Sequence, residues 1–112
     1  MKSSAIGVKV LQNAATANGD GALYNLSGCE HILICVSGTF SANVHFEATL
    51  DGTVWHEVAA RDLTTTNAND KAKTITAPGL YAIEHLGGIT TFRARVSGWS
   101  SGAVTVRANG QG

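Results

Sequence analysis

A succession of short apolar segments, each closed by small or polar turn residues, most constrains the fold of this chain. Runs such as "HILICVSG" (31–38), "TTFRARVSGW" (90–99) and "AVTVRANG" (103–110) are separated by Gly, Asn, Asp and Ser. No stretch of helical length carries the apolar period of about 3.6 residues that marks an amphipathic helix. Regularly spaced short strands are typical of a sandwich or a barrel. We therefore predict an all-β fold, an antiparallel β-sandwich of eight or nine short strands.

Two late segments predict which side chains face the core. In "FRARV" (92–96) and "VTVRA" (104–108) apolar and polar residues alternate, and alternate side chains of a strand point to opposite faces. The residues predicted to point inward are Phe92, Ala94, Val96, Val104, Val106 and Ala108. If the intervening "SSG" (100–102) forms a hairpin, Arg93, Arg95 and Arg107 lie together on one outer face.

The segment "HILICVSG" is apolar on both faces, as a strand covered on both sides would be. One of its faces is expected to pack against another subunit. The segment holds Cys35, and Cys29 precedes it. Six extended residues span about 20 Å, whereas the Cα atoms of a disulfide lie about 4.4–6.8 Å apart. We expect two free thiols, with Cys35 acting as a small core residue.

The length of 112 residues corresponds to one domain. We divide the chain into an N-terminal arm (1–7) suited to strapping a neighbouring chain, a β-sandwich domain (8–109) and a C-terminal tail (110–112). No signal peptide or membrane-spanning apolar run is recognised, so we expect synthesis in the host cytoplasm. The formal net charge is zero and only 14% of residues are charged. This argues against a nucleic-acid binder and favours a surface covered by partners.

The stretch "VHFEATLDGTVWHEVAA" (44–60) predicts a hairpin, since Asp-Gly is a strong turn signal. A two-residue turn at Asp51 would place a glutamate opposite Phe46 on the core face. We therefore prefer a three-residue turn that pairs Leu50 with Val54, although the sequence leaves both registers open. The residues then placed inside are Phe46, Ala48, Leu50, Val54 and Val58. Those placed outside, as the wet side of the hairpin, are His45, Glu47, Thr49, Trp55 and Glu57.

The polar residues of this hairpin suggest two kinds of chemistry, neither of which we favour. A metal site is disfavoured because His45 and His56 fall on opposite faces in either register, and no zinc-ligand spacing is present. Glu47 and Glu57 could face the same side like the carboxylates of a glycosidase, but an open strand face would not raise either pKa. No nucleophile elbow, phosphate loop or dinucleotide fingerprint is found. We expect neither an enzyme nor a cofactor.

Surface recognition is the remaining chemistry. An exposed Trp55, with Tyr24, Tyr81 and Trp99 as companions, could stack on a sugar ring. The competing interpretation is that these aromatics cap the ends of the core, each with a wet polar edge. The candidate residues for contact with a glycan or a partner are Trp55, Glu47, His45, Arg93, Arg95 and Arg107.

The runs "FEATLDGTVWHEV" (46–58) and "TITAPGLYAIEHLGGITTFRARVSGWSSGAVTVRANG" (74–110) resemble small proteins and modules encoded among the structural genes of tailed bacteriophages. In that group F-E-x-S/T-x-D-G-x-x-W precedes a polar loop, and A-x-G-L-Y/W, F-R-x-R-V-S and S-G-x-V-T-V follow in order. The resemblance covers roughly residues 40–108. The matching positions are Phe46, Glu47, Asp51, Gly52, Trp55, Gly79, Leu80, Tyr81, Phe92, Arg93, Arg95, Val96, Ser97, Gly102 and Val104.

The resemblance implies a jelly-roll-like sandwich located in a virion, and it supplies no catalytic residues. Because no fibre or second domain accompanies the sandwich, we expect a capsid decoration (cement) protein. Its partner would be the phage major capsid protein or another virion protein, and it would form a homo-oligomer such as a trimer. The alternative is a module of a phage tail or fibre that binds a surface glycan or the host surface. Neither interpretation involves nucleic acid or a membrane.

Overall fold

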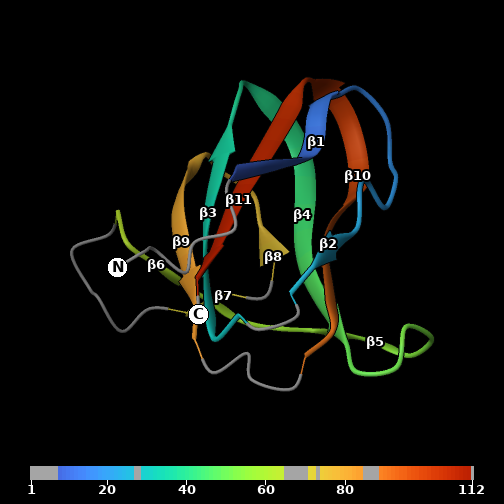
Figure 1. Ribbon diagram of the computed structural model, residues 1–112. Coiled ribbons are helices and arrows are strands. Elements are labelled where there is room, and N and C mark those ends of the chain that lie inside the picture. The colour runs from blue at the N-terminus through green and yellow to red at the C-terminus, as the bar shows by residue number, and fades with distance from the viewer. Residues whose placement is uncertain (1–7, 27–28, 65–70, 73, 85–88, 112) are drawn as a thin grey trace.

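The computed structural model describes residues 8–26, 29–64, 71–72, 74–84 and 89–111, which build an antiparallel β-sandwich (Figure 1). The predicted all-β sandwich is confirmed. In the described ranges the chain forms eleven strands, more than the eight or nine predicted, and five of these strands hold only two or three residues. They are β1 (Val8–Ala15), β2 (Tyr24–Asn25), β3 (His31–Ser37), β4 (Phe40–Thr49), β5 (Trp55–Glu57), β6 (Ala60–Asp62), β7 (Lys71–Ala72), β8 (Thr74–Ile75), β9 (Gly79–Ile83), β10 (Thr91–Gly102) and β11 (Val104–Gln111). The arm at 1–7 lies outside the described residues.

The strands form two sheets that face each other (Figure 1). The six-stranded sheet has the order β1-β11-β3-β9-β6-β7. The five-stranded sheet has the order β2-β10-β4-β5, and β8 also pairs with β4. The pairing of β10 with β4 runs from Thr91 opposite Thr49 to Gly102 opposite Phe40. This long pair forms the platform on which the polar residues of the predicted site stand.

Aromatic rings join the two sheets at the centre of the core. Phe46 and Phe92 of the five-stranded sheet are fully buried, with ring centroids 5.9 Å apart. The ring of Tyr81, from the six-stranded sheet, lies 6.0 Å from that of Phe46 in an edge-on arrangement. The Tyr81 hydroxyl donates to the carbonyl of Ala77, and the Tyr24 hydroxyl accepts from the amide of Gly110. Both tyrosines are therefore buried core residues whose hydroxyls are bonded.

The register predicted for the hairpin at 44–60 is confirmed, but the paired strands end at Thr49 and resume at Trp55, so five residues (50–54) connect them instead of three. Glu47 pairs with Glu57, and Thr49 with Trp55, which is the preferred register. The carboxylate of Asp51 holds the turn by accepting from the amides of Val54 at 3.0 Å and Thr53 at 2.8 Å. These two hydrogen bonds hold the pKa of Asp51 below its ordinary value.

The tip of this hairpin projects beyond the sandwich (Figure 1). Leu50 and Val54, predicted to lie inside, are therefore 67% and 53% exposed. Phe46 and Ala48 lie nearer the centre of the sheet and are buried as predicted. Alternation assigned the correct face, but it carries no information about where the opposing sheet ends.

The predicted hairpin at Ser100, Ser101 and Gly102 is wrong. β10 belongs to the five-stranded sheet and β11 to the six-stranded sheet, so the segment is a corner between the layers. Gly102 has a φ of 83°, and the amide of Ala103 donates to the carbonyl of Thr39 at 3.0 Å. Arg107 consequently lies on the opposite outer face from Arg93 and Arg95. The six residues predicted to point inward from these two strands are all buried.

Both cysteines are free thiols, as predicted, but the prediction that Cys35 is a core residue is wrong. Cys35 is exposed, because β3 directs Ile32, Ile34 and Val36 into the core and its alternate residues outward. Cys29 is buried, and burial raises the pKa of its thiol. The second apolar face of β3 is thus uncovered in the single chain.

Thiol labelling should separate the two cysteines. In the folded protein we expect a maleimide to react rapidly with one equivalent of thiol, that of Cys35, and with Cys29 only after denaturation. Burial and a raised pKa both lower the concentration of reactive thiolate at Cys29. Stopped-flow labelling should lose its fast phase in Cys35→Ser and keep it in Cys29→Ser. A fast phase that persists in Cys35→Ser would contradict the assignment.

Candidate functional site

The outer face of the five-stranded sheet brings together five of the six residues predicted to make contacts. Together with Glu57 they form an ionic cluster, defined here as His45, Glu47, Trp55, Glu57, Arg93 and Arg95. The strand register places them side by side, because Glu47 of β4 lies opposite both Arg93 of β10 and Glu57 of β5. His45 likewise lies opposite Arg95. Residues of three strands therefore meet on one face.

Glu47 is the centre of the ionic cluster. One carboxylate oxygen accepts from Nε of Arg93 at 2.8 Å, and the other accepts from Nε of Arg95 at 2.9 Å. The Glu47 side chain is only 9% exposed. Burial alone raises the pKa of Glu47, but the hydrogen bonds and positive charges of the two arginines outweigh it and hold the pKa below its ordinary value. Glu47 is therefore an ionised, internally neutralised group.

The rest of the cluster is arranged around this centre. A Glu57 oxygen lies 3.6 Å from Nδ1 of His45 and 3.8 Å from a terminal nitrogen of Arg95. Nε2 of His45 lies 2.6 Å from the hydroxyl of Ser97. Arg93 also reaches a carboxylate oxygen of Asp20 at 3.4 Å. Each charge of the cluster thus has a partner within the chain.

Trp55 takes part in the cluster through its ring. The guanidinium carbon of Arg93 lies 4.1 Å from the centroid of the indole, a distance typical of a cation–π contact. Trp55 is only partly exposed. One face of the ring is therefore covered by a residue of the chain itself.

This geometry corrects the expectation that the outer side of the hairpin is simply wet. As whole residues, Glu47 and Thr49 are only 6% and 1% exposed, although their side chains point away from the core. Arg93 and Arg95 of β10, a strand outside this hairpin, cover Glu47, so the sequence of the hairpin alone does not reveal its burial. Glu47 and Glu57 do share a face, but the two arginines keep Glu47 ionised and bind both of its carboxylate oxygens. The arrangement suits a structural clamp better than proton transfer.

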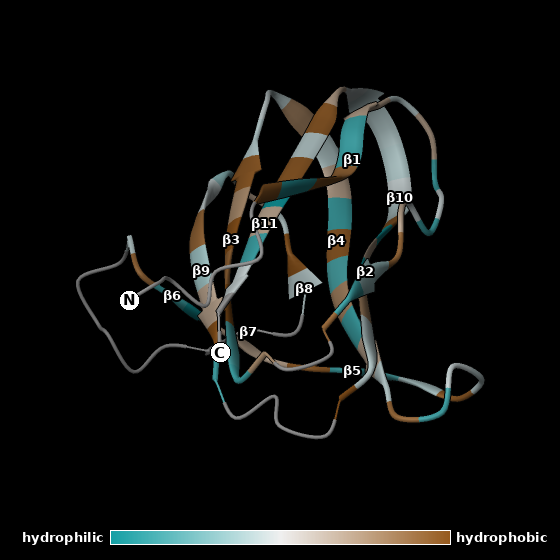
Figure 2. Cartoon of the chain, in the orientation of Figure 1, coloured by the Kyte–Doolittle hydropathy of each residue, from teal (hydrophilic) through white to brown (hydrophobic). Residues whose placement is uncertain are grey.

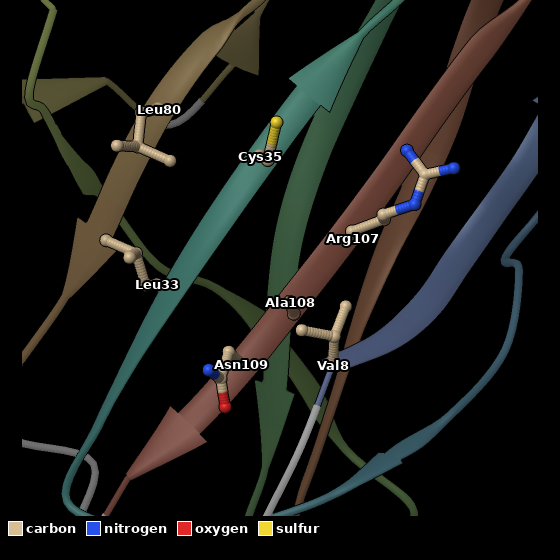
Figure 3. A pocket seen from close by; sticks show the side chains of 7 residues that line it. All are labelled: Val8, Leu33, Cys35, Leu80, Arg107, Ala108 and Asn109. Atoms are coloured by element: carbon tan, nitrogen blue, oxygen red, sulfur yellow. The ribbon is translucent and has the colours of Figure 1, made fainter. Parts of the chain in front are cut away.

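Arg107 stands apart from the ionic cluster, on the outer face of the six-stranded sheet. It borders a groove of 260 Å³ that crosses β1, β3, β9 and β11 (Figure 3). The groove is lined by Val8, Leu33, Cys35, Leu80, Arg107, Ala108 and Asn109. Of these residues, sequence reasoning named only Arg107 as a contact. The apolar second face of β3 was the signal for Leu33 and Cys35, whereas no local pattern marks Val8 or Asn109.

Pairing extends this groove into a larger surface, which we call the apolar face: Val8, Val10, Leu33, Cys35, Leu80 and Ala82, with Arg107 and Asn109 among them. One row runs Val10, Arg107, Cys35, Leu80 across four strands, and the next runs Val8, Asn109, Leu33, Ala82. Val8 is 66% exposed and Leu33 42% exposed. Figure 2 shows the hydrophobic residues on β1 and β3. The apolar face lies across the sandwich from the ionic cluster.

Neither surface carries a recognisable ion site. In the described ranges, no three His, Cys, Asp or Glu side chains are grouped so that they could hold a metal ion. The same ranges contain no helix long and apolar enough to cross a membrane.

Two solved structures share this sandwich. The SPBc2 prophage-derived protein YomS superposes with a TM-score of 0.83 over 95% of this chain and 92% of its own, at 16% sequence identity. The PBSX exported protein XepA superposes with a TM-score of 0.83 over 93% of this chain, at 18% identity. This chain covers only 37% of XepA. The chain matches no protein-family model and no curated protein in sequence. At these identities the likeness establishes the fold; the first neighbour is described as prophage-derived and the second as exported.

Proposed function

We propose that this protein is a non-enzymatic structural component of a phage particle, and that it binds another particle protein. In its most specific form the proposal is a capsid decoration protein with a jelly-roll-like sandwich, bound to the head shell as a homo-oligomer. The apolar face carries the proposal, because an exposed and largely apolar surface on a small sandwich is suited to being covered by a partner.

Two further observations support the proposal. The carboxylates and guanidinium groups of the ionic cluster pair with one another, so these charges are largely neutralised within the chain. One structural neighbour is described as prophage-derived and the other as exported, which fits a place in the virion or outside the cell. A small sandwich with one exposed, largely apolar face meets the needs of a particle protein.

The glycan-binding alternative is less well supported by the geometry. Stacking on a sugar requires an open aromatic face, and the Arg93 guanidinium already covers one face of Trp55. Tyr24 and Tyr81, two of the three companions considered for such a platform, are buried core residues. The ionic cluster therefore stabilises the sheet better than it presents a sugar platform.

Co-sedimentation tests the proposed function. Purified heads and purified tails of the encoding phage, prepared without this protein, are each mixed with it and pelleted. We expect saturable pelleting with heads, none with tails, and equal pelleting of Trp55→Ala. Light scattering of the free protein measures the expected oligomer. Protein that stays in the supernatant with heads, yet binds glycans on an array in a manner lost in Trp55→Ala, would contradict the proposal.

A further inference from the structure

We infer that the apolar face docks an extended segment of a partner protein that carries one carboxylate between apolar side chains, and that this carboxylate pairs with Arg107. The inference rests on the proposed function for the existence of a protein partner. It adds the surface, the form of the segment and the residue that selects it.

The apolar face supplies the area for docking. Its apolar side chains are exposed on β1 and β3 and half-buried on β9, and they border a groove on either side of β11 (Figure 3). Each row takes one residue from each of four neighbouring strands, and the two rows are two residues apart along each strand. An extended segment repeats its side chains with the same period of two. Such a segment can place an apolar side chain in each row.

Arg107 supplies the charge preference. The other three arginines are all ion-paired: Arg61 lies 3.0 Å from Glu84, and Arg93 and Arg95 both hold Glu47. No carboxylate in the described part of the chain lies within ion-pair distance of Arg107. Arg107 pairs with Cys35 on the neighbouring strand, at the groove. A guanidinium that is covered by an apolar partner requires a counter-charge from that partner. A carboxylate fits its forked donors.

Asn109 supplies an unused hydrogen-bond acceptor. Its side-chain oxygen is buried and has no hydrogen-bond partner among the described residues. It lies two residues from Arg107 on β11 and points to the same face, about 7 Å along the strand. That oxygen is covered in the single chain, so the Asn109 side chain has to turn outward on docking. Arg107 then donates and Asn109 accepts, which matches a carboxylate and an N–H group of one extended segment. This pairing favours a peptide over a ligand that carries only an anionic group.

A second copy of the chain fits the apolar face less well. Its groove is lined by a cation and no carboxylate. A two-fold contact between two copies would place both Arg107 guanidinia in one desolvated surface without counter-charges. Glu84, at the margin of the sheet, is already paired with Arg61. The surface is complementary to an acidic segment and not to itself.

Peptide titration tests the inference. The probes are two nonapeptides of alternating valine and threonine with blocked ends, one with a central aspartate and the other with a central lysine. NMR of the full chain should show shifts of amides in β3, β9 and β11 with the aspartate peptide, and the lysine peptide should bind at least about tenfold more weakly. Arg107→Glu should reverse this preference. Lys9→Glu makes the same charge change at an exposed residue that does not line the groove, and it should preserve the preference.

Each other outcome overturns the inference. Equal binding of both peptides, or an unchanged preference in Arg107→Glu, removes the role of Arg107. Phosphatidylglycerol vesicles that shift the same amides while the aspartate peptide does not would assign the face to lipid. Concentration-dependent shifts of these amides without peptide would assign it to a second copy.

Head co-sedimentation of Arg107→Glu separates this inference from the proposed function. If wild type and Arg107→Glu pellet equally with heads, the proposed function stands and the docking surface is wrong. If wild type fails to pellet but binds the aspartate peptide through Arg107, the docking surface stands and the head-binding role is wrong.

Discussion

Gly102→Ala should destabilise the protein by roughly 2–5 kcal/mol, a large part of the ~5–15 kcal/mol that stabilises a domain of this size. Gly102 adopts a φ of 83°, which costs a residue with a side chain about 1–2 kcal/mol. A Cβ atom would also overlap the carbonyl oxygen of Thr39 and lie 2.6 Å from the Cα of Phe40. These are backbone atoms of Phe40 in β4 and of Thr39 just before it, so the overlap can be relieved only by displacing the corner.

Gly52→Ala is the matched control for this prediction. Gly52 has nearly the same φ, 82°, but a Cβ there would meet nothing within 4 Å. It should cost only about 1 kcal/mol, since the φ penalty is partly offset by lower entropy of the unfolded chain. Urea unfolding of both variants measures the difference. Equal losses would mean that the corner is not packed as described.

Glu47→Gln should cost about 2–3 kcal/mol at neutral pH. This is somewhat below the ~3–5 kcal/mol for breaking a fully buried ion pair, because Arg93 and Arg95 remain partly exposed. The glutamine keeps the shape of the side chain but leaves two guanidinium groups without their carboxylate. Glu57→Gln is the control, because its side chain is 36% exposed and its contacts are longer, and it should cost at most about 1 kcal/mol.

The effect of Glu47→Gln should depend on pH. The folded-state pKa of Glu47 is lowered, so its contribution to stability is fully present above the unfolded-state value of about 4.3. That contribution is lost as the pH falls through the folded-state pKa. The stability difference between wild type and Glu47→Gln should therefore be constant near neutrality and narrow below about pH 4. A difference that is independent of pH would show that Glu47 acts by packing alone.

The candidate site was predictable only in part. Alternation placed Arg93 and Arg95 outward, and the exclusion of a glutamate from the core selected the register that puts Glu47 beside Glu57. Burial of Glu47 between two arginines was not predictable, because it requires β10 to pair with β4 across more than forty residues of sequence. The placement of Arg107 was mispredicted for the same reason. The prediction placed Arg107 beside Arg93 and Arg95 because the two segments are close in sequence, whereas the corner at Gly102 sends β11 to the other sheet.

The amino-acid sequence by itself determined that this chain forms short strands, and which side chains of those strands turn toward the core. Both follow from the pleat of the extended backbone, which sets apolar and polar residues on opposite faces of each strand. Only the tertiary structure decided which strands become neighbours, and hence that one outer face is neutralised by its own ion pairs while the other stays apolar. Backbone hydrogen bonds between strands are alike for every pair, so partner choice depends on distant packing and on the corner at Gly102, where only a residue without a side chain fits.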